Sequence, residues 1–114
     1  MIERERLRQM RGWILFFLSR ERPRDDGRPR QIGVDLLRRL LANAACDVSI
    51  EQVAAELAYL KGKGYVEVER FAAELRAKMP GAPAMGASIT SAGRDIVDGT
   101  TLDPGVEMGV LGEF

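Results

Sequence analysis

Residues 49–68 of the chain read Ser-Ile-Glu-Gln-Val-Ala-Ala-Glu-Leu-Ala-Tyr-Leu-Lys-Gly-Lys-Gly-Tyr-Val-Glu-Val. Ser49 is a favourable helix N-cap, and Gln52 can complete a capping box by reaching back to the Ser49 amide. The apolar residues behind this cap recur at helical spacing. They predict one inward-facing stripe, formed by Ile50, Val53, Ala54, Leu57 and Leu60.

Two glycines mark the end of this helix. Gly62 and Gly64 suit the left-handed conformation in which many helices stop, and Lys61 and Lys63 beside them complement the C-terminal helix dipole. Apolar and polar residues then alternate, which predicts a strand over 65–69. The stretch therefore predicts a helix that leads directly into a strand.

The length and composition are those of one globular domain. The 114 residues are 46% apolar and 30% charged, values typical of soluble proteins. A chain of this size buries about two thirds of the surface that its unfolded form exposes. We expect a domain over residues 1–99 and a C-terminal tail over 100–114.

Several classes of function are disfavoured by the composition. The longest apolar run, Trp13 to Leu18, is far shorter than the roughly 20 residues needed to cross a bilayer, and the charged start is unlike a secretory signal. The chain has one cysteine and no histidine, which argues against disulfides, zinc sites and histidine-based catalysis. We expect a cytoplasmic protein that is not an enzyme, with no catalytic residues, metal, cofactor or membrane partner.

Charge is unevenly distributed along the chain, although the formal net charge is zero. Residues 1–39 carry eleven arginines against six acidic residues, whereas residues 40–114 carry six basic residues against eleven acidic ones. This asymmetry indicates a nucleic-acid-facing end, an attraction between the two halves, or an attraction between two subunits. The sequence leaves all three interpretations open.

Two further helices are predicted before Ser49, over residues 3–20 and 32–44. Residues 21–31 between them contain two prolines and many charges, which is typical of a loop. The inward positions of the first helix are Leu7, Met10, Ile14, Phe17 and Leu18, and those of the second are Val34, Leu37, Leu40, Leu41 and Ala44.

The first helix is apolar nearly all round from Trp13 to Leu18. Either the rest of the domain covers both of its faces, or one face meets a second copy of the chain. An exposed patch with such large aromatic side chains is unusual for a monomer. We therefore favour a homodimer, with Trp13, Phe16 and Phe17 as the candidate interface.

The chain after the strand predicts a returning strand and a last helix. Residues 71–79 have a helical composition, and 88–90 predict a strand in which Ile89 packs on Val66 and Val68.

Thr90 is expected to cap a short helix over 91–98, which Gly99 ends. The tail over 100–114 is expected either to be loosely ordered or to lie along another subunit.

Two motifs resemble those of winged helix-turn-helix regulators (ArsR- and MarR-like). Residues 59–67, Tyr-Leu-Lys-Gly-Lys-Gly-Tyr-Val-Glu, resemble the end of the recognition helix, and residues 89–95, Ile-Thr-Ser-Ala-Gly-Arg-Asp, resemble the junction between the wing and the closing helix. The length, the hydrophobic first helix and the Gly-x-Asp-x-x-x-Gly ending also resemble small regulator-like proteins of Mu-like prophages. The resemblance covers most of residues 5–99.

This resemblance implies a mainly α fold with a small β-hairpin: a three-helix core, a wing and a short closing helix. The chain departs from the family in the long connection between its two strands and in its tail. The resemblance also implies that the helix beginning after Ser49 is the recognition helix.

The outward face predicted for this helix has few groups that read DNA. Its members are Glu51, Gln52, Ala55, Glu56, Tyr59 and Lys63. Base edges and phosphates are usually contacted by Arg, Lys, Asn or Gln, and a near-neutral or acidic face opposes the attraction to phosphate. Candidate contacts to double-stranded DNA are Gln52, Ala55, Tyr59 and Lys63 on the helix, Arg70, Arg76 and Lys78 in the wing, and Arg28 and Arg30 in the loop.

Two functions follow from these patterns. The first is a dimeric winged-helix transcriptional regulator of phage or prophage type that binds DNA. The second is a winged-helix protein–protein interaction module, a phage-encoded adaptor without DNA binding. The family resemblance favours the first, and the charge of the outward face favours the second. From the sequence we expect the first, a DNA-binding regulator, and keep the second as the alternative.

Overall fold

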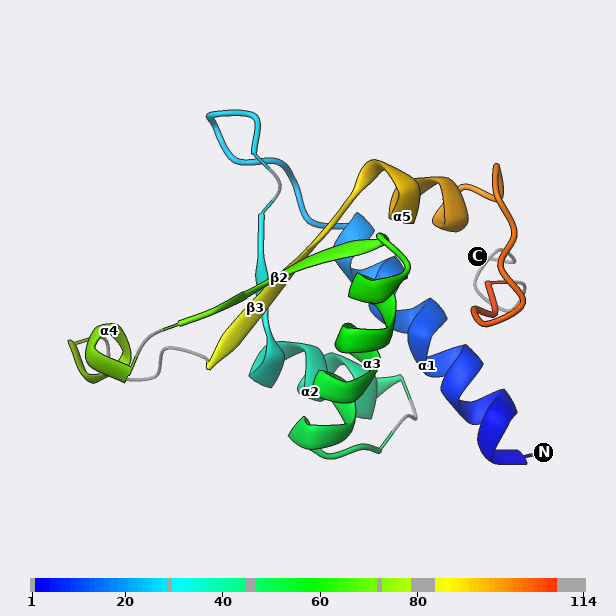
Figure 1. The fold of residues 1–114 in the computed structure, drawn as a ribbon, viewed down its shortest axis with the longest axis horizontal. Coiled ribbons are helices and arrows are strands. Elements are labelled where there is room, and N and C mark those ends of the chain that lie inside the picture. The colour runs from blue at the N-terminus through cyan, green and yellow to red at the C-terminus, as the bar shows by residue number, and fades with distance from the viewer. Residues whose placement is uncertain (1, 29, 45–46, 72, 79–83, 109–114) are drawn as a thin grey trace.

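A computed structural model describes residues 2–28, 30–44, 47–71, 73–78 and 84–108, with the side chains of residues 2 and 74–76 outside the description. These residues form a mainly helical protein with a small three-stranded antiparallel sheet (Figure 1). In chain order the elements are α1 (Ile2–Ser19), β1 (Ile32–Gly33), α2 (Val34–Asn43), α3 (Ile50–Gly62), β2 (Val66–Arg70), α4 (Ala73–Lys78), β3 (Met85–Ile89) and α5 (Ser91–Val97).

The hydrophobic core lies where α1, α2 and α3 meet one another and the sheet. Most of the predicted inward positions contribute to it, because helical and strand periodicities direct those side chains to one side. The fully buried core side chains of the helices are Met10, Ile14, Leu15, Leu18, Val34, Leu37, Leu41, Val53, Leu57, Leu60 and Ile96. No helix of the described residues is both long enough and apolar enough to span a membrane.

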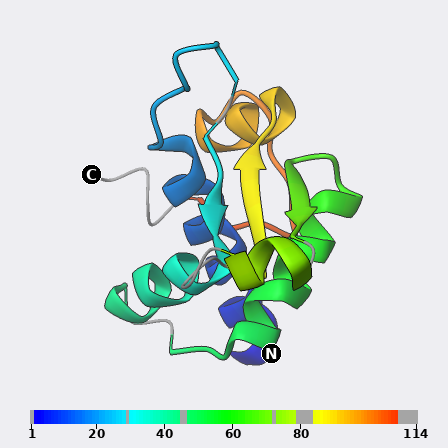
Figure 2. The same ribbon diagram turned by 90° about the vertical axis from the view of Figure 1, so that its left-hand side faces the viewer.

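The three strands are ordered β1-β3-β2, so β3 is central and β2 lies at one margin of the sheet (Figure 2). Ile89 lies opposite Val66, as the sequence predicted, whereas Val68 lies opposite Ala87. The returning strand is longer than the predicted 88–90, and the first strand is displaced by one residue from 65–69. The predicted hairpin therefore forms, with β1 as an additional third strand.

Both predicted helix caps are present. The Ser49 hydroxyl accepts a hydrogen bond from the Gln52 amide at 3.1 Å, and the Thr90 hydroxyl accepts one from the Gly93 amide at 3.1 Å. Gly64 adopts the left-handed conformation after α3, with φ of 81°, whereas Gly62 is still part of the helix. One glycine, not two, therefore makes the turn into β2.

The start of the second helix and one inward position of the third differ from the sequence prediction. The second helix begins at Val34, not at residue 32, because Ile32 pairs with Ala87 of β3 as part of β1. Ile50 is 40% exposed although the stripe placed it inside. It is the first residue of α3, and the core begins one turn later, at Val53.

The described part of the tail packs on the chain's own helices. Val106 is buried, and the Glu107 amide donates a hydrogen bond to the Arg8 carbonyl of α1 at 3.1 Å. A Cβ built on Gly12 would lie 2.1 Å from the Glu107 carbonyl oxygen, so only glycine permits this approach of the tail to α1. Val106 and Glu107 of the predicted tail therefore pack against the chain's own helices.

Candidate functional site

The exposed surface of α3 determines which side chains are available to a partner. Val53, Leu57 and Leu60 lie in the core. Of the α3 residues outside this stripe, one group faces solvent and another is covered by the rest of the chain. The exposed side consists of Glu51, Ala55, Ala58, Lys61 and Gly62, whereas Gln52, Glu56 and Tyr59 are partly or fully covered.

Glu56 was predicted to face outward, and this prediction is wrong. Its side chain is 6% exposed and accepts a hydrogen bond from Arg11 Nε at 2.6 Å, forming an ion pair with an arginine that is itself 15% exposed. Gln52 donates its side-chain amide to the other Glu56 oxygen at 3.0 Å, so it does not complete the capping box. Glu56 and Gln52, both predicted to face outward, are therefore engaged in a cluster around Arg11 of α1.

Tyr59 is covered by the same arginine and by the tail. The Arg11 guanidinium carbon lies 3.6 Å from the centre of the Tyr59 ring, a cation–π contact, and Arg11 Nη1 donates to the Gly105 carbonyl at 3.1 Å. A Cβ on Gly105 would meet the Tyr59 hydroxyl at 2.1 Å. Tyr59 is thus a packing residue between α1, α3 and the tail.

Asp103 is the centre of a second group of tail contacts. It accepts hydrogen bonds from the Tyr65 hydroxyl at 2.5 Å and from the Gly105 amide at 2.7 Å, and Lys63 Nζ lies 3.8 Å away. The Tyr65 hydrogen bond, followed by the Gly105 amide and the charges of Lys63 and Arg11, lowers the pKa of Asp103 despite its burial. The same hydrogen bond, with burial and the Asp103 charge, raises the pKa of Tyr65 to about 12.

Three of the four residues of the α3 region predicted to contact DNA make these contacts within the chain. Gln52, Tyr59 and Lys63 are engaged within the chain, and only Ala55, which has no polar side-chain atom, lies on the exposed side. Arg11 was the informative residue that sequence analysis missed. It lies at helical spacing from Leu7, Ile14 and Leu18 and so shares their inward side.

The exposed side of α3 presents small and apolar side chains with balanced charge. Glu51 and Lys61 are its only charged residues, and no arginine, asparagine or glutamine is exposed on the described helix. Ile50 at its first turn is 40% exposed, and Leu36 of α2 is 41% exposed. This surface has none of the planar donors that pair with base edges.

The predicted wing cations are only partly described. Arg70 at the end of β2 and Lys78 in α4 are exposed, whereas the side chain of Arg76 lies outside the description. Glu67 and Glu69 of β2 are also exposed. The described part of the ribbon therefore presents both signs of charge.

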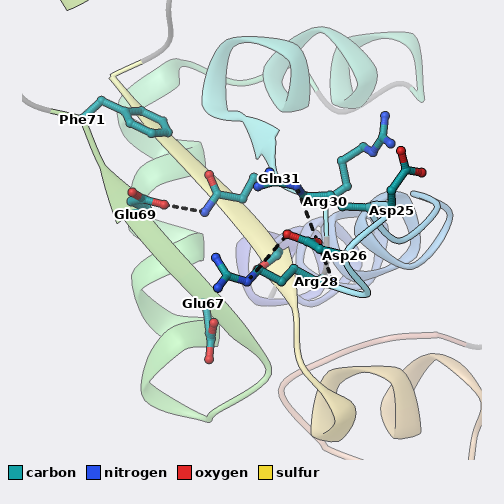
Figure 3. Close-up of a pocket in the computed structure, with 10 residues that line it drawn as sticks. Asp25, Asp26, Arg28, Arg30, Gln31, Glu67, Glu69 and Phe71 are labelled. Carbon is teal, nitrogen blue, oxygen red and sulfur yellow. Dashed lines mark hydrogen bonds and ion pairs between the residues drawn. The ribbon is translucent and has the colours of Figure 1, made fainter. Parts of the chain in front are cut away.

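A groove lies between the loop before β1 and the outer face of β2 and β3 (Figure 3), with a volume of about 900 Å³. Its walls carry three arginines and four acidic residues, so it is not a phosphate cradle. Gln31 bridges the walls by donating its side-chain amide to Glu69 at 2.7 Å. The charged lining residues are Arg24, Asp25, Asp26, Arg28, Arg30, Glu67 and Glu69.

The two loop candidates differ in their surroundings. Asp26 accepts a hydrogen bond from the Arg28 amide at 3.0 Å, and the Arg28 side chain forms a 3.8 Å ion pair with the same carboxylate. Arg30 is exposed, and no described residue forms an ion pair with it. Arg30 is therefore the more available of the two.

The candidate dimer residues form one aromatic cluster on α1. Trp13 stacks on Phe17 at a centroid distance of 5.4 Å, and Phe16 meets both rings edge-on at 5.9 Å. All three are partly buried, and Trp13 and Phe17 pack against the core. A homodimer through this cluster stays a prediction, which the mass of the protein in solution tests.

Within the described residues, no group of three or more His, Cys, Asp and Glu side chains is arranged to hold a metal ion. Comparisons of the chain with protein-family models, curated proteins and solved structures found no match.

Proposed function

We propose that this chain is a winged helix-turn-helix protein that serves as a protein–protein interaction module, an adaptor that does not read DNA. The order of its elements supports the fold: α2, a short connection and α3 are followed by a β2–β3 ribbon that extends beyond the helices (Figure 1). In this fold α3 occupies the position of the recognition helix.

The composition of the exposed side of α3 carries the proposal. A DNA-reading helix presents donors to base edges, and most non-specific affinity comes from cations near phosphates. Here the exposed side has one acidic residue, one lysine and the small residues Ala55, Ala58 and Gly62. Small side chains with flanking Ile50 and Leu36 suit contact with a protein surface, because they allow the partner's side chains to approach the helix backbone closely.

A position-specific photo-crosslink tests this proposal. A photoreactive phenylalanine analogue at Ala58 is expected to attach a protein of the native host extract, because Ala58 lies at the middle of the exposed side. The matched control carries the analogue at Asp98, which is exposed at the end of α5 and remote from α3 in chain order. An adduct that forms equally at both positions, or at neither, contradicts the proposal.

DNA binding is the second candidate function, favoured by one observation. Arg30, Arg70 and Lys78 are exposed and form no ion pair with the described residues. Three phosphate contacts would make the logarithm of the binding constant fall with the logarithm of salt concentration, with a slope of roughly −3. The interaction-module proposal instead predicts no salt-sensitive binding to a duplex.

A duplex titration over a salt series separates the two candidates. Under the DNA hypothesis, Arg70→Glu with Lys78→Glu abolishes binding, while Lys61→Glu on the far end of α3 has a smaller effect. Tight, salt-sensitive binding that these wing changes remove would overturn the adaptor proposal.

A further inference from the structure

The outer margin of β2 is an unpaired sheet edge. The Thr90 amide donates to the Tyr65 carbonyl at 3.0 Å, and the Phe71 amide donates to the Ala84 carbonyl at 3.0 Å. Odd-numbered residues of β2 therefore direct their backbone groups toward β3, because the direction alternates along a strand. The amides and carbonyls of Val66, Val68 and Arg70 consequently face away from the sheet.

The accessible part of this edge begins at Val68. Val66 is 2% exposed, so other parts of the molecule cover its backbone, whereas Val68 is partly exposed and Arg70 is exposed. Within the described residues, neither Val68 nor Arg70 makes a backbone hydrogen bond outside the β2–β3 ladder. β2 occupies the margin of the sheet in Figure 2, with β3 on its inner side.

The side chains beside this edge are acidic on one face. Glu67 and Glu69 are exposed and line the groove of Figure 3. The Glu69 carboxylate accepts the hydrogen bond from Gln31, whereas the Glu67 carboxylate has no hydrogen-bond or ion-pair partner in the described part of the chain. Val68 and Arg70 lie on the opposite face, since side chains alternate.

A second copy of β2 does not fit this edge. Antiparallel pairing of the outward-facing residues permits three central registers, which place Glu67 opposite Glu67, Glu67 opposite Glu69, or Glu69 opposite Glu69. Like charges directly opposite each other destabilise a strand pair. The two glutamates therefore protect the edge from self-association, a common device of natural edge strands.

We propose that the β2 edge binds an extended, basic segment of a partner protein as an added antiparallel strand. Two basic side chains would lie opposite Glu69 and Glu67, with an apolar one between them opposite Val68 and an acidic one opposite Arg70. The order Glu-Arg-Val-Arg satisfies all four positions. The inference rests on the proposed function in requiring a protein partner, but it uses a surface distinct from the exposed side of α3.

A peptide titration followed by amide NMR tests the inference on the intact chain. The probe is Thr-Glu-Arg-Val-Arg-Thr, and the charge-reversed control is Thr-Lys-Glu-Val-Glu-Thr. The probe is expected to shift the Val68 and Arg70 amides most and to slow their hydrogen exchange, because both amides become donors to the added strand. Each of the three charge pairs contributes between about 1.4-fold and fivefold, and charge reversal turns each attraction into a repulsion of similar size, so the reversed peptide is expected to bind roughly tenfold more weakly or worse.

Variants of the chain locate the binding site. Arg70→Pro removes one outward amide without removing a ladder donor and is expected to abolish binding, whereas Arg70→Ala keeps that amide and retains binding within about fivefold. Glu67→Arg is expected to lower the affinity for the probe peptide about tenfold and to raise the affinity for the charge-reversed peptide. Asp95→Arg, at an exposed position of α5, leaves both affinities unchanged.

Equal affinity for the two peptides, or no shift at Val68 and Arg70 at millimolar peptide, overturns the inference and leaves the glutamates only the role of keeping the edge unpaired. The crosslink at Ala58 is independent of these results. A protein adduct there without peptide binding rejects the edge inference alone, and peptide binding without that adduct rejects the α3 surface alone.

Discussion

Arg11 and Glu56 link α1 to α3 through charges that are largely removed from water. The two side chains are 15% and 6% exposed, and each has a further partner: the Gly105 carbonyl for Arg11 and the Gln52 amide for Glu56. A buried pair of this kind adds little stability relative to apolar side chains of similar volume, but loss of one member leaves an uncompensated charge. The pair therefore specifies how the two helices meet.

Replacing one member of this pair is expected to destabilise the protein strongly. Glu56→Met should lower the free energy of unfolding by about 3 kcal/mol, because Arg11 remains buried without a counter-charge. The double variant Arg11→Met with Glu56→Met should recover at least half of that loss. Urea unfolding measures both values.

Glu51→Met is the control for the exposed side of α3. Glu51 is exposed and has no ion-pair partner in the described residues, so the free energy of unfolding should change by less than about 0.5 kcal/mol. A double variant no more stable than Glu56→Met alone would contradict this account of the Arg11–Glu56 pair.

At the scale of elements and segments, the attachment of residues 101–108 to the domain depends on contacts between titratable side chains. Asp103 joins this segment to the start of β2 through Tyr65, and to the end of α3 through Lys63. The carboxylate is stabilised in its charged form and the phenol in its neutral form. Attachment of the segment should therefore weaken at both extremes of pH.

The pH dependence follows from the direction of each shift. The Asp103 pKa is lowered by folding, so its contribution is complete above its unfolded value near 3.8 and is lost as pH falls through the folded value. The Tyr65 pKa is raised, so its contribution is complete below its unfolded value near 10 and is lost as pH rises toward about 12.

Tyr65→Phe is expected to reduce both the acidic and the alkaline loss of stability, because it removes the hydrogen bond that is the largest cause of each pKa shift. Unfolding free energies measured in urea across pH 2–12 test this. Tyr59→Phe, whose hydroxyl makes no hydrogen bond with a described residue, should keep the pH profile of the parent chain. A Tyr65→Phe profile equal to the parent profile would refute the linkage.

The elements whose local signals were strong were predicted well from the sequence. The Ser49 and Thr90 caps and the stops at Gly64 and Gly99 depend on residues within one turn of each helix end. Such local interactions are readable without knowledge of the fold. Of the three strands, β1 was missed because two residues are too short to show alternation.

The candidate site was predicted less well, because burial of polar residues depends on distant partners. Glu56 and Tyr59 have the spacing of an outward face, but Arg11 and Gly105, far away in the chain, cover them. The prediction for Ile50 was wrong for the opposite reason, since the core contacts α3 only from Val53, three residues after Ile50. The sequence pattern distinguishes the sides of a helix, whereas tertiary contacts determine which side is exposed to solvent.

At the scale of the whole molecule, the two distant parts of the chain that meet at Gly12 complete the fold. The Arg8 and Gly12 region of α1 holds Glu107 by a backbone hydrogen bond and an ion pair, with Arg8 Nη2 and a Glu107 carboxylate oxygen 3.4 Å apart. The absence of a Cβ at Gly12 is what admits the tail. The structural unit consequently includes residues 100–108 as well as the predicted domain.

Gly12→Ala is expected to destabilise the protein by about 1–2 kcal/mol, because the new Cβ collides with the backbone of Glu107. The matched control is Gly62→Ala, where nothing lies within 4 Å of the new Cβ and the helix should gain about 0.5–1 kcal/mol. Thermal unfolding of both variants measures the difference. Equal stabilisation by the two alanines would show that the tail does not lie against α1.

The close approach of the tail to α1 at Gly12 also affects how the chain folds during synthesis. Arg11 and Gly105 are hydrogen-bonded across a separation of 94 positions, so α1 leaves the ribosome well before this neighbour does. While synthesis continues, that side of α1 stays open to water and to other nascent chains. Any protein bound to that side during this interval must leave before Gly105 can reach Arg11.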